Sequence, residues 1–333
     1  MKVGLFINTQ FPGGFNLAER VPEMVEQVRA ARNAGFASLW FPHHWLTHPM
    51  QMLQITPVMG YVAAHAQGMT IGPNILILPP LNPMHVAEEA ATLDVLTGGN
   101  YILGVGLGYR QPEFDAFGIS LTERAPRFNE SITLMRRLWT EERVTFEGQY
   151  YRTIGATIYD RPEKPVPIWI AASGPTAAAM AGEIGDGFIC TSGKGDALYR
   201  DTLLPKVEEG LKRAGRPGGN LERMIEVKVS FDTDPKRAME DTRHWAALAL
   251  TPEEKMSVED PREMERLADA LPIERAASRW IVSSDPEEQL AQIRPYVDLG
   301  LTHLVFHAPG PDQPRFLKLY AEQVLPLLRS KLS

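Results

Sequence analysis

Residues 83–108 read PMHVAEEAATLDVLTGGNYILGVGLG, and they contain a helix, a turn and a strand in immediate succession. Pro83 stands where prolines favour the first turn of a helix, and we expect this helix to run to Leu96. The glycines of the Thr97–Gly99 turn end it, because they adopt backbone angles that a helix does not use. The apolar run Tyr101–Gly106 follows as a strand. The stretch therefore predicts one unit of an alternating α/β protein.

The rest of the chain repeats this alternation. Short apolar runs such as VGLFI and ILIL suit strands that are buried on both faces, as in a parallel sheet. Eight strands are expected, at Val3–Asn8, Ser38–Pro42, Met69–Leu76, Tyr101–Gly106, Pro167–Ala172, Gly187–Thr191, Glu226–Phe231 and His303–His307. Helical patterns are expected at Leu17–Ala34, Pro83–Leu96, Arg127–Trp139, Ala177–Ile184, Leu203–Ala214, Pro286–Leu299 and Pro314–Leu332. This order predicts an α/β fold, a (β/α)8 TIM barrel with insertions.

Two insertions interrupt the alternation, and no linker divides the chain. Residues Arg143–Thr153 alternate as a hairpin that turns at Glu147-Gly148. Residues 232–275, between the seventh and eighth strands, are charged and helical in pattern, and they are long enough to cover part of the barrel mouth. We therefore expect a single domain over residues 1–333 with a helical insertion at 232–275.

Composition narrows the class of protein. The formal net charge is −7, so the balance of charges does not favour binding to nucleic acid or to an anionic membrane. The first residues, MKVGLFINTQF, indicate a strand and not a signal peptide, and no run is long enough for a membrane helix. Cys190 is the single cysteine, which excludes an intramolecular disulfide and a cysteine-based metal site. A cytoplasmic protein without a metal is the expectation.

The active site of such a barrel lies at the carboxyl ends of the strands. His43 and His44 follow the second strand, and His48 comes shortly after them. Histidine exchanges protons near neutral pH, and adjacent histidines in an extended loop point to opposite sides, so at most one is expected to face the pocket. The alternative is a structural His–Trp loop. A metal site is disfavoured because no nearby acid or cysteine completes a ligand set.

Three other strand ends carry candidate binding residues. The glycine run Gly104–Tyr109 allows close approach of a flat ligand, although close packing at the rim would explain it equally. Ala172, Ser173, Gly174, Pro175 and Thr176 lead into a helix, whose free N–H groups suit a phosphate. Lys194 lies in a glycine–serine turn that suits an anionic group, and a solvated loop lysine is the alternative.

These motifs resemble the bacterial luciferase-like superfamily of flavin- and F420-dependent oxidoreductases. The N-terminal carriers of the resemblance are HHW at His43–Trp45, the run from Pro83 to Asn100, and LGVGLGYRQPEFDAFGI. The resemblance implies a cofactor bound by His43, Gly106, Leu107, Gly108 and the loop at 172–176. It also implies a cis peptide at Asn74-Ile75 behind the cofactor ring.

The C-terminal half resembles F420-dependent glucose-6-phosphate dehydrogenases, through GDGFICTSGKG, MIEVKVSFD, ALPIERAASRWIVSSDP and GLTHLVFHAPGPDQPRF. That resemblance implies a phosphate cradle of Thr191, Lys194, Lys255 and Arg279, and a catalytic role for His44. Three positions depart from it. Tyr109 replaces a catalytic glutamate, His48 replaces an active-site tryptophan, and Met256 replaces a histidine. We therefore include Tyr109 as a catalytic candidate, beside His44 and His43, and His48 as a substrate contact.

Two cofactors and three functions stay open at this point. Coenzyme F420 is favoured because Leu107 is apolar where many FMN-dependent relatives carry a phosphate-binding arginine, and FMN is the alternative. The first function is hydride transfer between F420 and a small, anionic or phosphorylated alcohol or carbonyl compound. The second is oxygenation with reduced FMN, and the third is flavin binding or storage without turnover. The resemblance also implies a homodimer.

Overall fold

The computed structural model describes residues 1–216, 221–251, 253–254, 258 and 260–332. Its central feature is a 10-stranded sheet in which every pairing is parallel, in the order β5-β3-β1-β14-β12-β11-β10-β7-β6, with β13 beside β12. An additional bridge between Ile71 and Tyr101 joins its two ends. The strands are β1 (Lys2–Phe6), β3 (Ser38–Phe41), β5 (Thr70–Pro73), β6 (Leu76–Ile77), β7 (Leu103–Gly106), β10 (Ile168–Ala171), β11 (Gly187–Thr191), β12 (Glu222–Phe231), β13 (Ile281–Ser283) and β14 (His303–His307). The predicted barrel is confirmed.

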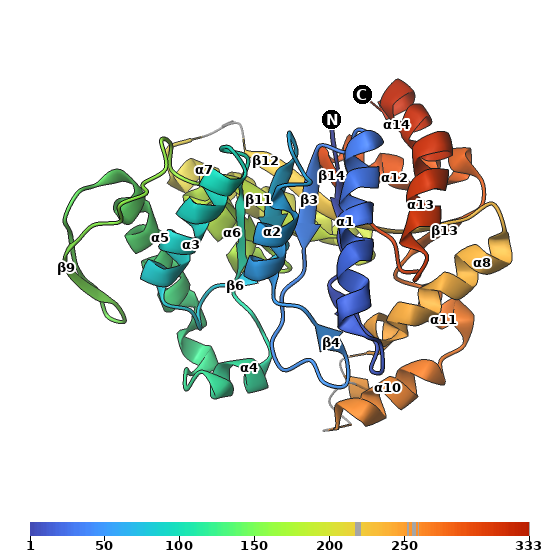
Figure 1. The fold of residues 1–333 in the computed structure, drawn as a ribbon, viewed down its shortest axis with the longest axis horizontal. Coiled ribbons are helices and arrows are strands. Elements are labelled where there is room, and N and C mark those ends of the chain that lie inside the picture. Colours follow the sequence, from blue (N-terminus) through green and yellow to red (C-terminus); the bar gives the residue numbers. More distant parts are fainter. Residues whose placement is uncertain (217–220, 252, 255–257, 259, 333) are drawn as a thin grey trace.

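Helices surround the strands (Figure 1). Some of them begin at a side-chain cap: the side chain of Asn82, for example, accepts a hydrogen bond from the N–H of Met84 (2.9 Å) immediately before Pro83. The larger helices are α1 (Leu17–Asn33), α2 (Ile55–Ala63), α3 (Pro83–Leu96), α5 (Arg124–Thr140), α6 (Pro175–Ile184), α7 (Leu204–Arg213), α12 (Pro286–Asp298), α13 (Gln313–Leu319) and α14 (Leu325–Leu332).

The structure differs from the predicted elements in several places. The strand expected at Met69–Leu76 is divided into β5 and β6, because a cis peptide between Asn74 and Ile75 interrupts it. The helices α2 and α4 (Gln111–Ala116) were not predicted: Pro57 and Gly60 obscure the helical pattern of α2, and α4 is only 6 residues long. The short strand β13 was also missed, since its 3 residues carry little pattern.

The interior of the barrel is filled with large side chains. Phe6, Trp40, Trp169, Ile189, Met224 and Val305 form one buried cluster. The rings of Trp40 and Trp169 are stacked with their centroids 5.3 Å apart. Because this plug occupies the centre, ligands are restricted to the end of the barrel, where the loops after the strands lie.

Two segments extend the barrel. The strands β8 (Val144–Glu147) and β9 (Arg152–Ala156) pair antiparallel, as the hairpin prediction required, and Figure 1 shows them projecting from one side. Between β12 and β13 lie α8 (Pro235–Glu240), the 3₁₀ segment η3 (Asp241–Ala249), α10 (Pro261–Asp269) and α11 (Ile273–Ala277). Asp232 anchors this helical segment, since its carboxylate accepts hydrogen bonds of 2.5 and 2.7 Å from Arg315.

Close backbone contact between β7 and the end of β5 yields a first prediction. A Cβ added at Gly104 would stand 2.1 Å from the backbone oxygen of Pro73, whereas one at Gly60 in α2 would meet nothing within 4 Å. We expect Gly104→Ala to lower the free energy of unfolding by about 1–3 kcal/mol, through overpacking. Gly60→Ala should raise it by about 0.5–1 kcal/mol, because alanine favours helix. Urea unfolding of both variants measures this, and equal effects would contradict the close packing.

Candidate active site

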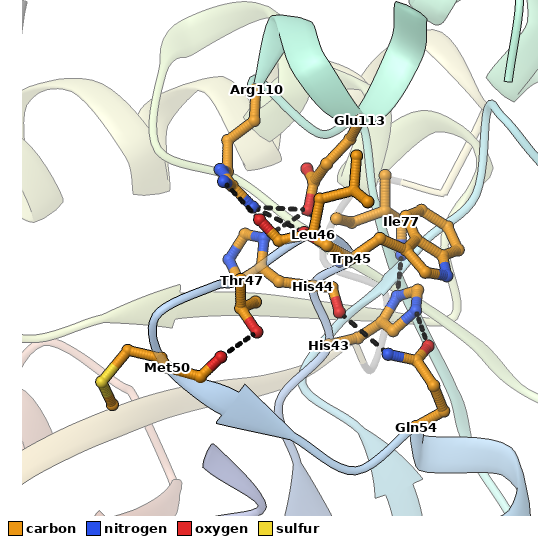
Figure 2. Close-up of polar contacts among 10 residues, drawn as sticks. All are labelled: His43, His44, Trp45, Leu46, Thr47, Met50, Gln54, Ile77, Arg110 and Glu113. Carbon is orange, nitrogen blue, oxygen red and sulfur yellow. Dashed lines mark hydrogen bonds and ion pairs between the residues drawn. The ribbon is translucent and has the colours of Figure 1, made fainter. Parts of the chain in front are cut away.

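The loop after β3 presents the two adjacent histidines to opposite sides, as Figure 2 shows. His43 is buried. Its Nδ1 accepts a hydrogen bond from the N–H of Ile77 (3.2 Å), so its Nε2 carries the proton that is shared with Oε1 of Gln54 (3.2 Å). Burial, followed by repulsion from His44, lowers the pKa of His43 to about 4. His43 is therefore a neutral side chain with both nitrogens occupied, and it lacks a free atom for proton transfer.

His44 points the other way and remains accessible. Its Nδ1 lies 2.9 Å from Oε1 of Glu113, and its side chain is 29% exposed. A carboxylate can only accept a hydrogen bond, so Nδ1 carries the proton and Nε2 of the neutral ring is a bare acceptor. No residue that the structure describes makes a hydrogen bond to this Nε2. Of the two histidines, His44 has the free acceptor that acid–base chemistry needs.

Glu113 holds the loop in this conformation. It is fully buried at the start of α4, and Oε1 also accepts hydrogen bonds from the N–H of Trp45 (2.9 Å) and from Arg110 (3.1 Å). Burial opposes its ionisation, but the hydrogen bonds that His44 and the backbone of Trp45 donate, together with the charge of Arg110, lower the pKa of Glu113 below its usual value. The carboxylate is thus charged at neutral pH.

Arg110 completes the connection between the two loops. Its guanidinium donates to the backbone oxygens of Trp45 (2.8 Å) and Leu46 (3.2 Å) while it contacts Glu113 (Figure 2). Leu46 has a φ of 50°, an uncommon conformation for a residue with a side chain. These contacts fix the backbone from which His44 projects.

Glu113 and Arg110 were not predicted as site residues, although both lie in the run LGVGLGYRQPEFDAFGI. Their role depends on a contact between two loops that are 69 residues apart in the chain, which no local pattern reveals. The available signal was an acid in the first turn of a helix that follows the glycine run. Tyr109, at the position of the expected acid, is 70% exposed, and its ring centroid lies 6.0 Å from that of His44.

The residues proposed for the cofactor line neighbouring strand ends. The cis peptide implied at Asn74-Ile75 is present, and the side chain of Ile75 lies so close to Gly106 that an added Cβ would stand 2.6 Å from it. Gly108 has a φ of 72°, which glycine adopts without strain. Leu107 packs against the main core and brings no charge to this place.

The segment from Ala172 to Thr176 consists of the loop after β10 and the first two residues of α6. Gly174 caps the helix without a side-chain hydrogen bond to the first N–H groups. Ser173 and Thr176 are exposed, and a Cβ at Gly174 would meet nothing within 4 Å. The first N–H groups of α6 therefore have no side-chain cap, and the anion site expected at this helix N-terminus stays a prediction.

The structure brings most of the expected anion cradle together. Tyr199 donates to the backbone oxygen of Thr191 (2.7 Å) and receives the N–H of Lys194 (3.3 Å), which fixes the turn after β11. Gly193 in this turn packs against Arg279, since an added Cβ would stand 2.7 Å from the Arg279 oxygen. Partial loss of water, followed by the positive charges of Arg279 and Lys228, lowers the pKa of Lys194. Lys228 was not predicted.

Two expected substrate contacts are not in this group. Lys255 lies outside the described residues, so its place is not assigned. His48 is exposed, next to a cis bond with Pro49, and it takes no part in the hydrogen bonds around His44.

Within the described ranges, no group of three or more potential ligands could hold a metal ion. None of the helices described there has the length and apolar character needed to cross a membrane.

The family model for luciferase-like monooxygenases matches residues 1–303. The chain belongs to this family. The resemblance inferred from HHW, the glycine run and the C-terminal motifs is thereby confirmed.

Within the family, similar curated proteins are F420-dependent glucose-6-phosphate dehydrogenases. That of Nakamurella multipartita is 52% identical over 316 residues, covering 92% of this chain and 93% of that protein. One from Rhodococcus jostii is 55% identical over 253 residues, covering 74% of this chain and 75% of that protein. The match to each extends through both halves of the barrel.

Solved structures give the same fold. An F420-dependent secondary alcohol dehydrogenase in complex with an F420-acetone adduct has a TM-score of 0.85 at 27% identity, covering 98% of this chain and 99% of that one. The F420-dependent tetrahydromethanopterin reductase of Methanopyrus kandleri has a TM-score of 0.81 at 22% identity, covering 98% and 99%, and this likeness shows the fold alone.

The lowered pKa of His43 predicts how stability depends on pH. The unfolded state binds a proton at this residue below about pH 6.5, and the folded state does not until about pH 4. Its contribution to stability is therefore complete above pH 6.5 and lost as the pH falls to 4, by about 3 kcal/mol. The difference in unfolding free energy between wild type and His43→Gln should change over this window. His48→Gln is the control, and parallel curves for wild type and His43→Gln would contradict a neutral buried His43.

Proposed function

We propose that this protein is an F420-dependent oxidoreductase that oxidises a hydroxyl group of a phosphorylated substrate, with glucose 6-phosphate as the first candidate. The observation that carries this proposal is that one barrel presents His44, whose Nε2 is free, after β3, and the positive cradle of Lys194 and Arg279 at the turn after β11. The names of the curated relatives support both the cofactor and the substrate.

The strand ends between β5 and α6 fit a flat cofactor with a phosphate. Gly106 and Gly108 keep side chains away from the surface beside Ile75, and Leu107 offers no charge where FMN-dependent relatives are expected to carry an arginine. The open N-terminus of α6 would hold the phosphate. When bound, F420 supplies a two-electron hydride acceptor.

His44 would serve as the base. Oxidation of an alcohol to a carbonyl releases a hydride from carbon and a proton from oxygen, and the proton needs an acceptor. Nε2 of His44 is such an acceptor, while Glu113, which binds Nδ1–H, stabilises the imidazolium that forms. Glu113 is here a positioning residue, because it acts through His44.

The cradle would orient the substrate. A phosphate monoester carries a charge of about −1.5 to −2 at neutral pH. Lys194 and Arg279 offer it charge-assisted hydrogen bonds, and Thr191 lies beside them. Binding energy gained at this end is converted into alignment of the hydroxyl with His44. Tyr109, close to the His44 ring, would orient the substrate or donate a hydrogen bond.

The proposal is tested by titrating the purified protein with F420 and with FMN, followed by turnover with glucose 6-phosphate. We expect micromolar or tighter binding of F420, weaker binding of FMN, and reduction of F420 that depends on the sugar phosphate. Failure to bind F420 would refute the cofactor assignment. Oxygen consumption that requires reduced FMN would instead support a monooxygenase.

The role of His44 is tested by comparing its alanine variant with the same substitution at a histidine outside the site, His85. His44→Ala should lower kcat by about 10²–10⁴-fold, because it removes the base, and leave the Kd for F420 nearly unchanged. His85→Ala, on the outer face of α3 where His85 pairs with Glu89 (3.2 Å), should leave turnover unchanged. Equal turnover of wild type and His44→Ala would refute the role of this histidine.

A further inference from the structure

A second buried histidine–carboxylate pair lies above the apolar plug. Side chains two residues apart in a strand point to the same side of the sheet. One face of β12 therefore carries Met224, Glu226 and Lys228 in succession. Met224 belongs to the plug, so Glu226 and Lys228 follow it toward the carboxyl end of the barrel interior. In the neighbouring strands, Thr191 is paired with Glu226 and His307 with Lys228. Figure 1 shows these strands, β11, β12 and β14, side by side.

These four side chains form a continuous network. Oε1 of Glu226 lies 2.7 Å from Nδ1 of His307 and 3.3 Å from Nζ of Lys228, and Lys228 also donates to Oγ1 of Thr191. Burial opposes the ionisation of Glu226, but the charge of Lys228 and the hydrogen bonds of His307 and Thr191 hold its pKa far below the usual range. A buried ion pair such as Glu226–Lys228 adds little to stability. Stability alone therefore does not explain why this pair is present.

His307 has an atom without a partner. Burial lowers its pKa, so the ring is neutral, and Glu226 requires the proton to be on Nδ1. Nε2 is then a bare acceptor on a residue that is 2% exposed, and nothing in the described part of the chain bonds to it. An unpaired buried acceptor is unfavourable unless a ligand supplies the donor.

The ring of His307 is also held in a fixed orientation. It stacks on Phe6 with centroids 4.1 Å apart, and it meets Trp245 and Trp280 edge-on, at 5.1 Å each. Trp280 follows Arg279 of the anion cradle, and its Nε1 is likewise buried without a partner among the described residues. The aromatic contacts thus connect the network to the cradle. They also hold Nε2 of His307 in one position in the absence of a ligand.

The charges around the network point to an anion. Partial burial, followed by the positive charges of Arg279 and Lys228, lowers the pKa of Lys194, while the charge of Glu226 opposes this effect. The charge of Glu226 is already matched by Lys228, so the two remaining cations have no carboxylate partner in the described residues. Two uncompensated positive charges match the charge of a phosphate monoester.

We propose that Thr191, Glu226, Lys228 and His307 form the floor of the substrate site, where Lys228 extends the anion cradle and Nε2 of His307 accepts a hydrogen bond from a substrate hydroxyl. The substrate would therefore be a phosphorylated polyhydroxy compound that is read at a second hydroxyl as well as at its phosphate. Glu226 is a positioning residue that sets the tautomer of His307. This inference rests on the proposed function and assigns specificity within it.

The role of His307 is tested with glucose 6-phosphate and its analogues that each lack one ring hydroxyl, as substrates of the F420-saturated enzyme. Wild type should lose about tenfold to a hundredfold in kcat/KM with one analogue, because Nε2 then stays unpaired. His307→Phe keeps the ring contacts and should reduce this particular penalty to less than about twofold. His307→Gln, which keeps a polar group, should give an intermediate penalty. Identical penalties in wild type and both variants would overturn the assignment.

The matched control is His303→Gln. His303 is buried four residues before His307 on β14, where it contacts Ser38 (2.7 Å), and its replacement should alter stability without changing the pattern of penalties. A change of that pattern in the control equal to that in His307→Phe would also overturn the proposal.

The role of Lys228 is tested with inorganic phosphate by calorimetry, on wild type and Lys228→Met. We expect the Kd for phosphate to rise about tenfold and the Kd for F420 to stay the same. An unchanged Kd for phosphate would refute the extended cradle. This measurement needs no turnover. A wild-type protein that binds phosphate through Lys228 but does not bind F420 would therefore refute the proposed function while supporting the role of Lys228 in the anion cradle.

Discussion

The carboxylate of Glu113 is the interaction on which the geometry of the candidate site depends. A buried charge costs several kcal/mol unless its surroundings replace the lost water. His44, the backbone of Trp45 and Arg110 provide that replacement, and Arg110 also binds the oxygens of Trp45 and Leu46. The loop after β3 and the start of α4 are thereby held together. The same contacts determine which nitrogen of His44 is protonated.

The barrel uses this arrangement twice. Glu113 binds Nδ1 of His44, and Glu226 binds Nδ1 of His307, at 2.9 and 2.7 Å. In both pairs Nε2 is left as an acceptor, but the surroundings differ: His44 is accessible, whereas His307 is enclosed by three aromatic rings. An accessible acceptor suits proton transfer, and an enclosed one suits recognition. The apolar plug formed around Trp40 and Trp169 keeps both pairs at one end of the barrel.

The sequence predicted those parts of the protein that depend on local pattern. Continuous apolar runs located the eight barrel strands, and the strand ends located His44, Lys194 and the start of α6. The contacts of Glu113 with His44 and of Glu226 with His307 span 69 and 81 residues, so no periodicity reveals them. Lys228 was missed for another reason. The sequence of an apolar strand does not show whether a lysine in it faces the barrel interior or the rim, and only the strand register places Lys228 beside His307.

The most direct test of this account is the tautomer of His44. In protein labelled with ¹⁵N-histidine, at about pH 8 where histidines are generally neutral, nitrogen chemical shifts distinguish a protonated ring nitrogen from a bare one. We expect Nδ1 of His44 to be protonated and Nε2 to be bare, and Glu113→Ala, which removes the acceptor of Nδ1–H, to abolish this preference. Protonation of Nε2 in the wild type, or the same tautomer mixture in both proteins, would contradict the role of Glu113 in preparing His44 as the base.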